Sequence, residues 1–147
     1  MNKRNKITYI LFALILVGVY FANVEIQTYL GKRVLNESGL MIHDLPVAME
    51  LAAAQSKPVL ANLSAIWCPT CRKLDKTVLS DPRVQDIIND RFVFSRIEYE
   101  SDEGGEFQKR YSISGFPKLL VLGPDGEKIR MLDLTMDPDK FISQLSL

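Results

Sequence analysis

Two cysteines, Cys68 and Cys71, are the side chains of this 147-residue chain whose type and spacing best support chemistry. They are the only cysteines of the sequence, Pro69 and Thr70 separate them, and Trp67 precedes them. The thiolate is the form of cysteine that attacks disulfides. In a Cys-x-x-Cys pair, one sulfur can attack a substrate disulfide while the other resolves the mixed disulfide. The motif therefore predicts thiol–disulfide exchange.

The residues on either side of the motif predict the elements that hold it. Residues 59–63 have the composition of a short buried strand that ends just before the motif. Beyond the motif, apolar residues such as Leu74 recur at helical spacing from Cys71. Pro69 suits the first position of this helix, because the N–H that proline lacks has no partner there. Cys68 is then predicted at the helix cap, exposed and activated, with Cys71 one turn further along the buried stripe.

Length and composition predict one globular domain with its own core. Hydrophobic residues make up 47% of the chain and charged residues 24%, proportions that disordered chains lack. The formal net charge is zero, but residues 1–24 hold three basic residues and no acidic one, which leaves 15 basic against 18 acidic residues elsewhere. The sequence contains no basic run and no basic stripe with interleaved aromatic residues. Nucleic acid is therefore not an expected partner.

Residues 7–24 form an uncharged, apolar run. At ~1.5 Å per residue the run covers about 27 Å, close to the ~30 Å hydrocarbon core of a bilayer. The basic residues before it favour a cytoplasmic location for residues 1–6. The run is interpreted either as a retained single-pass anchor, which we favour, or as a cleaved signal peptide. Cleavage after Ala22 would place the bulky Tyr20 where a small residue is preferred.

Residues 25–39 are predicted to be a membrane-proximal tether, with some helix through Ile26, Tyr29 and Leu30. The domain itself is predicted to span residues 40–147 and to begin with an edge strand at Leu40, Met41 and Ile42. Under either interpretation of the apolar run, this domain is expected to lie outside the cytoplasm.

Apolar periodicity in the domain predicts alternating helices and strands. A helix over residues 46–55 is expected to bury Val47, Leu51 and Ala54. The elements expected after the cysteine helix are a helix capped by Asp81, a strand at 91–100, a helix at 103–111, strands at 118–122 and 127–132, and a helix capped by Asp137. This order predicts an α/β fold in which helices flank a mixed sheet.

The segment 67–71, joined to Gly-Phe-Pro at 115–117, resembles the thioredoxin superfamily. Residues 57–59 and 76–85 narrow the resemblance to the thioredoxin-like branch that includes the C-terminal periplasmic domain of the disulfide reductase DsbD. The resemblance covers about residues 40–147 and implies a thioredoxin-like fold, here preceded by one transmembrane helix.

The resemblance implies roles for individual residues. Cys68 matches the nucleophile and Cys71 the resolving thiol, so their redox-active disulfide is expected to serve without a separate cofactor. Pro117 matches the cis-proline that faces the cysteines and pairs with the backbone of an extended substrate. The substrate-binding positions implied in this way are Trp67, Pro69, Thr70, Phe116 and Pro117.

Several positions depart from the family pattern. Asn62 stands where thioredoxin carries a buried Asp that assists proton transfer, and Ile66 stands where an acid is frequent. Strand order suggests Glu98 as the nearest carboxylate. Phe116 is bulkier than usual before the proline, and a proline at the position of Pro69 occurs in oxidising relatives and glutaredoxins. The sequence therefore leaves the direction of electron flow open.

Metal binding and a structural disulfide are less favoured roles for the cysteine pair. A structural zinc site needs four ligands, and His43 is the only histidine of the chain, so no metal is expected. A purely structural disulfide would close so short a loop that it would add little stability.

The resulting hypothesis is a thiol–disulfide oxidoreductase in the cytoplasmic (inner) membrane, with its catalytic domain in the periplasm or outside the cell. Its expected partners are disulfide-containing exported proteins and an electron donor in the same membrane, and its expected action is reduction or exchange. The alternatives are a periplasmic oxidase, a thioredoxin for cytochrome c maturation, and a non-catalytic module that binds client chains beside Pro117.

Overall fold

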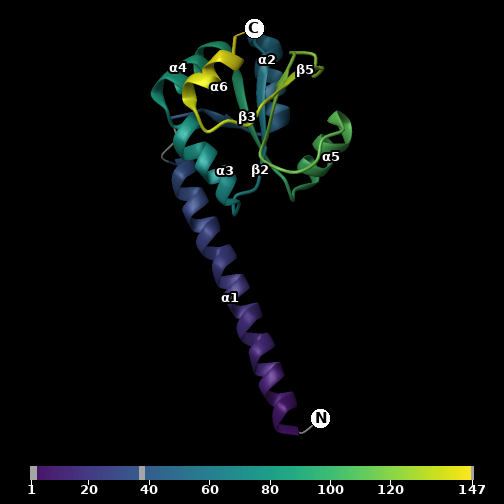
Figure 1. Cartoon of the computed structure of the whole chain (residues 1–147). Helices are drawn as coiled ribbons and strands as arrows, with labels where there is room; N and C mark the ends of the chain where they lie inside the picture. The colour runs from purple at the N-terminus through teal and green to yellow at the C-terminus, as the bar shows by residue number, and fades with distance from the viewer. Residues whose placement is uncertain (1–2, 37–38, 147) are drawn as a thin grey trace.

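A five-stranded mixed sheet, in the strand order β1-β3-β2-β4-β5, forms the centre of the domain (Figure 1). The computed structural model describes residues 3–36 and 39–146, so the predicted segments that include residues 1–2, 37–38 and 147 lie partly outside it. Strands β1, β3 and β2 are mutually parallel, β4 is antiparallel to β2, and β5 is antiparallel to β4. The strands are β1 (Ile42–His43), β2 (Val59–Ser64), β3 (Val93–Glu98), β4 (Lys118–Leu122) and β5 (Lys128–Leu132). This confirms the predicted mixed sheet, and its edge strand begins at Ile42, later than the predicted start at Leu40.

Helices cover both faces of the sheet (Figure 1). The helices of the domain are α2 (Leu45–Gln55), α3 (Pro69–Leu74), the π-helical segment η1 (Asp75–Leu79), α4 (Pro82–Arg91), α5 (Asp102–Tyr111) and α6 (Pro138–Gln144). Side chains of α2 and α5 pack on one face of the sheet, and those of α3, η1, α4 and α6 pack on the other. The predicted order of elements is therefore confirmed.

Strand β2 lies in the interior, and all six of its residues are buried. Because successive side chains of a strand point to opposite faces, Leu60 packs with α3 and α4 while Ala61 packs with α2 and α5. Burial on both faces explains why this strand is a continuous apolar run up to Asn62. The strand delivers the chain directly to the cysteine motif.

The predicted aspartate caps are present. Asp81 accepts a hydrogen bond from the backbone N–H of Arg83 at the start of α4, and Asp137 accepts from Asp139 and Lys140 at the start of α6. These side-chain oxygens partner N–H groups that no helical carbonyl can reach.

The prediction for the buried face of α2 is partly wrong. Ala48 and Ala52 are fully buried, whereas Val47 is 45% exposed, Ala54 faces solvent and Leu51 is half-buried. The alanines let the helix lie close to the sheet, so the larger Val47 is turned outward. Apolar periodicity alone favoured the larger side chains.

Helix α1 (Lys3–Asn36) is one continuous helix of 34 residues. It includes a stretch, Ile7–Leu35, that is long and apolar enough to cross a membrane, and the most apolar part of that stretch is not buried against protein. The predicted tether is therefore helical as far as Asn36, well beyond Ile26, Tyr29 and Leu30. No proline interrupts this segment, and its C-terminal part packs against the domain.

The C-terminal part of α1 docks beside α3, while its apolar part projects away from the domain (Figure 1). Gly31 is buried, and a Cβ atom added there would overlap the carbonyl oxygen of Ile66. Arg72 of α3 donates a hydrogen bond to the side-chain oxygen of Gln27. Helix α1 thus contacts the loop that leads to the first cysteine.

Replacement of Gly31 by alanine is expected to loosen this docking. The added methyl group must displace the Ile66 peptide, and such overpacking costs about 1–3 kcal/mol. The expected result is faster amide hydrogen exchange in both α1 and the 65–72 segment of the full chain in detergent.

Gly18→Ala is the matched control, because Gly18 lies in the same helix and a Cβ atom added there would have nothing within 4 Å of it. Both substitutions raise helix propensity equally. Identical exchange in the two variants would mean that α1 does not depend on Gly31 for docking.

Candidate active site

Cys68 caps the N-terminus of α3, as the sequence predicts, and Pro69 occupies the first turn. The backbone N–H of Cys71 donates a hydrogen bond to the Cys68 sulfur, with an N–S distance of 3.1 Å. A hydrogen bond donated to sulfur stabilises negative charge on it. The local fold of α3 therefore places the Cys68 sulfur at the helix N-terminus, where it accepts the N–H of Cys71.

Cys71 lies one turn further into the helix and is fully buried. Burial, reinforced by its interaction with Cys68, raises the pKa of the Cys71 thiol to about 12, although Ser64 and the backbone of Ala65 oppose the rise. Cys71 is therefore a neutral thiol at physiological pH. Both cysteines are free thiols in this structure.

The predicted exposure of Cys68 is wrong. Only 5% of this residue is accessible to solvent. Trp67, Tyr99 and Phe116 pack against the cluster formed by Ala65 and the two cysteines. We refer to these three aromatic residues as the aromatic cover.

The aromatic cover is held together by ring contacts from three separate segments. The ring of Phe116 lies edge-on to those of Trp67 and Tyr99, at centroid distances of 5.5 and 4.5 Å. The indole N–H of Trp67 donates a 3.1 Å hydrogen bond to Glu100. Sequence reasoning missed Tyr99. Tyr99 could have been found from its position directly after the strand at 93–98. Because β3 is parallel to β2, the carboxyl ends of both strands meet at the edge of the sheet that carries the cysteines.

The other implied substrate-binding positions differ in their exposure to solvent. Pro69 and Thr70 are exposed at the start of α3, whereas Pro117 is buried. The peptide bond between Phe116 and Pro117 is cis. The structure thus brings Trp67 and Phe116 against the cysteines and leaves Pro69 and Thr70 open to solvent beside them.

Glu98, the carboxylate suggested by strand order, lies at the end of β3 beside the cysteine loop. It accepts a 2.9 Å hydrogen bond from the backbone N–H of Ile66. Burial raises the pKa of Glu98 above its ordinary value, while that hydrogen bond and the charge of Arg96 act in the opposite direction. Glu98 thus fixes the loop that joins β2 to α3.

A buried ion pair lies on the same side of the sheet as α3. Arg96 of β3 donates from Nη1 to both carboxylate oxygens of Asp75 in η1, at 3.1 and 3.0 Å. Their side chains are only 7% and 3% exposed. Sequence reasoning missed Asp75, although its position four residues after Cys71 places it on the buried face of the helix.

Asn62, which replaces the expected acid, pairs in register with Arg96 on the neighbouring strand. It is fully buried, and within the described residues neither its side-chain nitrogen nor its side-chain oxygen has a hydrogen-bond partner. The buried carboxylate on this side of the sheet is thus supplied by Asp75 from the helix. Among the described residues, no group of three or more histidine, cysteine or acidic side chains is arranged to hold a metal.

The chain belongs to the thioredoxin-like family, whose profile matches residues 40–124. The thiol:disulfide interchange protein DsbD of Pseudomonas fluorescens is 33% identical over 97 residues, which are 65% of this chain and 17% of that protein. Similarity to the DsbD-like branch is therefore confirmed, but this chain spans only about a sixth of the length of the curated relatives it matches.

Solved structures support the same assignment. A thioredoxin from Thermus thermophilus superposes with a TM-score of 0.65 at 29% identity, covering 72% of this chain and 84% of that one. The reduced C-terminal domain of DsbD from Neisseria meningitidis superposes with a TM-score of 0.60 at 28% identity, covering 71% and 96% respectively.

The raised pKa of Cys71 predicts asymmetric alkylation. At pH 8 only ~10⁻⁴ of a thiol with a pKa of about 12 is thiolate, and this fraction grows tenfold per pH unit. In the folded, reduced protein, iodoacetamide is expected to label Cys68 as the aromatic cover opens, and to spare Cys71. Mass spectrometry of the digested protein measures each site.

Denatured protein is the control, since both sulfurs should be labelled at similar rates once burial is removed. Equal labelling of the two sulfurs in the folded chain at pH 8 would contradict the protonated state assigned to Cys71.

Proposed function

We propose that this protein is a membrane-anchored thiol:disulfide oxidoreductase that reduces or exchanges disulfides of exported proteins. The observation that carries the proposal is the division of roles between the sulfurs. Cys68 accepts the N–H of Cys71 at the helix cap, and Cys71 remains a buried, protonated thiol. This arrangement suits Cys68 as nucleophile and Cys71 as resolving thiol.

The exchange consumes two thiols and one substrate disulfide. The Cys68 thiolate attacks one substrate sulfur, the substrate disulfide breaks, and the second substrate sulfur leaves as a thiolate. Cys71 then attacks the Cys68 sulfur and forms the Cys68–Cys71 disulfide, the first substrate sulfur leaves as a thiolate, and this thiolate takes up the proton that Cys71 loses. The substrate gains two electrons, and a dithiol donor must reduce the protein again.

Substrate access requires movement of the aromatic cover, because Cys68 is only 5% exposed. Phe116 contacts both other rings of the cover and directly precedes Pro117. A substrate backbone that lies along Pro117 would displace Phe116 and reach Cys68. Pro69 and Thr70, both exposed, would contact the substrate on the other side of the sulfur.

The position of the cysteines relative to α1 supports an electron donor in the same membrane. Ile66, two residues before Cys68, contacts α1 at Gly31, which lies about 10 Å along the helix beyond Val24, the end of the uncharged run. The start of α3 lies at the end of the domain from which α1 projects (Figure 1). Anchoring also raises the effective concentration of such a donor. The name of the DsbD relatives, thiol:disulfide interchange protein, agrees with this role.

Reduction is the proposed direction, with the periplasm or cell exterior as the compartment. There, exported proteins hold disulfides that a reductase can act on. The reduction potential of the Cys68–Cys71 pair tests the direction. A value above about −150 mV, near that of strong oxidants, would favour the oxidase alternative.

Trapping of mixed disulfides tests the proposed chemistry and identifies the clients. Cys71→Ser keeps the attacking sulfur but cannot resolve the intermediate, so exported proteins should accumulate in covalent complexes through Cys68 that thiols release. The double variant Cys68→Ser/Cys71→Ser is the control. Failure of Cys71→Ser to form any such complex would contradict the proposed exchange.

A further inference from the structure

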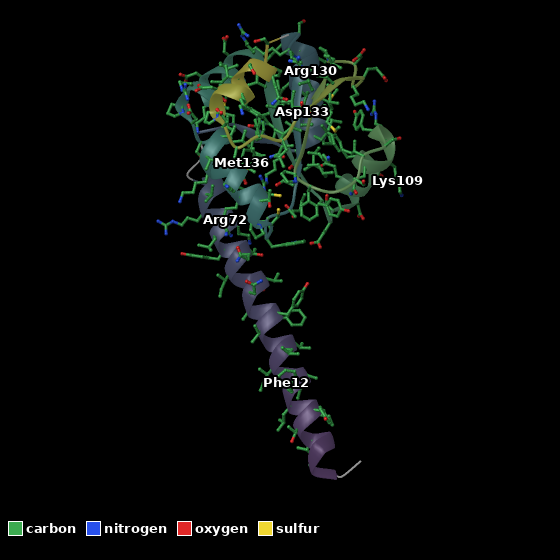
Figure 2. All side chains as sticks on the ribbon, viewed as in Figure 1. Phe12, Arg72, Lys109, Arg130, Asp133 and Met136 are labelled. Carbon is green, nitrogen blue, oxygen red and sulfur yellow. The ribbon has the colours of Figure 1, made fainter. Side chains whose placement is uncertain are left out.

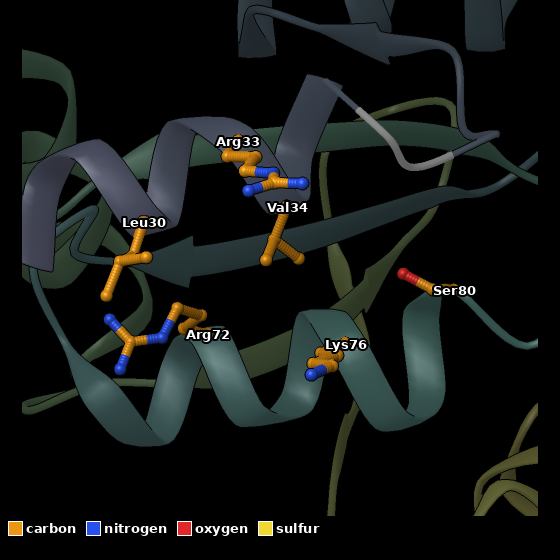
Figure 3. A pocket seen from close by; sticks show the side chains of 6 residues that line it. All are labelled: Leu30, Arg33, Val34, Arg72, Lys76 and Ser80. Atoms are coloured by element: carbon orange, nitrogen blue, oxygen red, sulfur yellow. The ribbon is translucent and has the colours of Figure 1, made fainter.

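A groove of about 630 Å³ separates the C-terminal part of α1 from α3 and η1 (Figure 3). Six residues line it: Leu30, Arg33, Val34, Arg72, Lys76 and Ser80. Three of the six are cations, contributed by both sides of the groove, and no carboxylate is among these lining residues. Leu30 and Val34 supply an apolar flank on the α1 side. The combination of cations and apolar surface suits an anionic amphiphile.

Arg72 and Lys76 are positioned to bind one anion together. They are four residues apart, on the same face of the helix. The hydrogen bond from Arg72 to Gln27 holds the guanidinium across the groove toward α1. Only one of its nitrogen atoms is used in that bond, and the planar guanidinium can still offer parallel donors to a phosphate. Arg33 lines the groove from the α1 side.

The membrane-proximal end of the groove, at Arg72, lies at the height of the phosphate layer of a membrane. Gln27 lies three residues beyond Val24, or about 4.5 Å along the helix. The headgroup layer on each side of a bilayer is about 5–8 Å thick. Arg72, bonded to Gln27, therefore stands at headgroup height, whereas Lys76 in η1 lies about one helical turn further from the membrane.

We propose that this groove binds a phosphate group, and that an anionic phospholipid headgroup at the membrane surface supplies it. Bound there, the lipid bridges α1 and α3 and fixes the rotation of the domain about its anchor. The inference rests on the proposed membrane anchoring of α1, but not on the proposed cysteine chemistry. Inorganic phosphate is the other source of the same ligand chemistry.

Lipid competition followed by native mass spectrometry tests the proposal on the full chain. The protein in neutral detergent is mixed with equal amounts of phosphatidylglycerol and phosphatidylcholine, and the lipids retained are counted. One phosphatidylglycerol per chain is expected to be retained in preference to phosphatidylcholine. In Arg72→Gln/Lys76→Gln this retention should fall about tenfold or more, because each cation near an anionic headgroup strengthens binding severalfold.

The matched control is Lys109→Gln/Lys128→Gln, which removes the same charge from exposed positions outside the groove. Lys109 lies on α5, on the opposite side of the domain from Arg72 (Figure 2). Lys76→Gln alone is also measured, since it leaves the bond between Arg72 and Gln27 intact. It should weaken retention while preserving the melting temperature.

Each outcome bears on the proposal. Equal retention by the wild type and the double variant, or equal retention of the two lipids, overturns the groove as a lipid site. Displacement of the lipid by 10 mM inorganic phosphate supports a phosphate site but overturns the lipid as its source. Disulfide reduction is measured on the same samples. A wild-type chain that reduces disulfides but shows no lipid preference refutes the groove alone. A wild-type chain that does not reduce disulfides refutes the proposed function instead.

Discussion

Replacement of Cys68 by serine is expected to lower the rate of disulfide reduction by about 10³-fold or more. A serine hydroxyl at the cap of α3 can accept the same N–H of Cys71, so the helix should be preserved while the nucleophile is lost. Cys71 cannot take over the attack, because it is fully buried and its pKa is raised to about 12. Turnover of a disulfide peptide by the full chain, with a dithiol reductant, measures the effect.

Cys71→Ser is the comparator for this experiment. It should also lose turnover, but it should still release one substrate thiol per chain in a single attack, which Cys68→Ser should not. Thermal unfolding of both variants checks that the fold is intact. If Cys68→Ser retained full biological activity, exchange would not be the function, and the client-binding alternative would be favoured.

The replacement Asp75→Asn is expected to destabilise the domain by about 3–5 kcal/mol. The carboxylate accepts both hydrogen bonds from Arg96 Nη1, and both side chains are at least nine-tenths buried. Asparagine would leave the guanidinium charge buried without a counter-charge. Guanidinium chloride denaturation of the full chain in detergent measures the change in the free energy of unfolding.

Asp139→Asn is the matched control, because Asp139 pairs with Arg83 at the surface, where their side chains are 76% and 59% exposed. That change should cost at most about 1 kcal/mol. A cost for Asp75→Asn as small as the control would contradict the structural role of the buried pair.

The paired replacement of Asp75 by leucine and Arg96 by methionine tests the same ion pair by removing both charges together. Burial raises the pKa of Asp75, although Arg96 opposes the rise, so the pair does not fully offset the cost of removing its charges from water. An apolar pair of similar volume should therefore recover much of the stability lost in Asp75→Asn.

Features with local causes could be predicted from the sequence. Proline after Cys68 and the apolar spacing from Cys71 predict the cap and the buried stripe, because both depend on one turn of helix. The same holds for the caps Asp81 and Asp137. Alternating elements then predict the mixed sheet, since a strand–helix–strand order followed by a hairpin allows few topologies.

Features that join distant segments could not be predicted in this way. The aromatic cover combines Trp67, Tyr99 and Phe116, and its rings bury a sulfur that the helix cap alone would leave exposed. The Asp75–Arg96 pair depends on how η1 lies over β3.

By itself, the sequence determined which two sulfurs are the candidates for exchange, the elements that carry them and an apolar segment that can span a membrane. Only the tertiary structure decided that Cys68 is covered, that a buried carboxylate comes from Asp75, and that α1 docks through Gly31 beside the cysteine loop. The physical reason is that periodicity and caps act within a turn or a strand, whereas packing between distant segments decides burial, ion pairing and the shape of the groove beside Arg72.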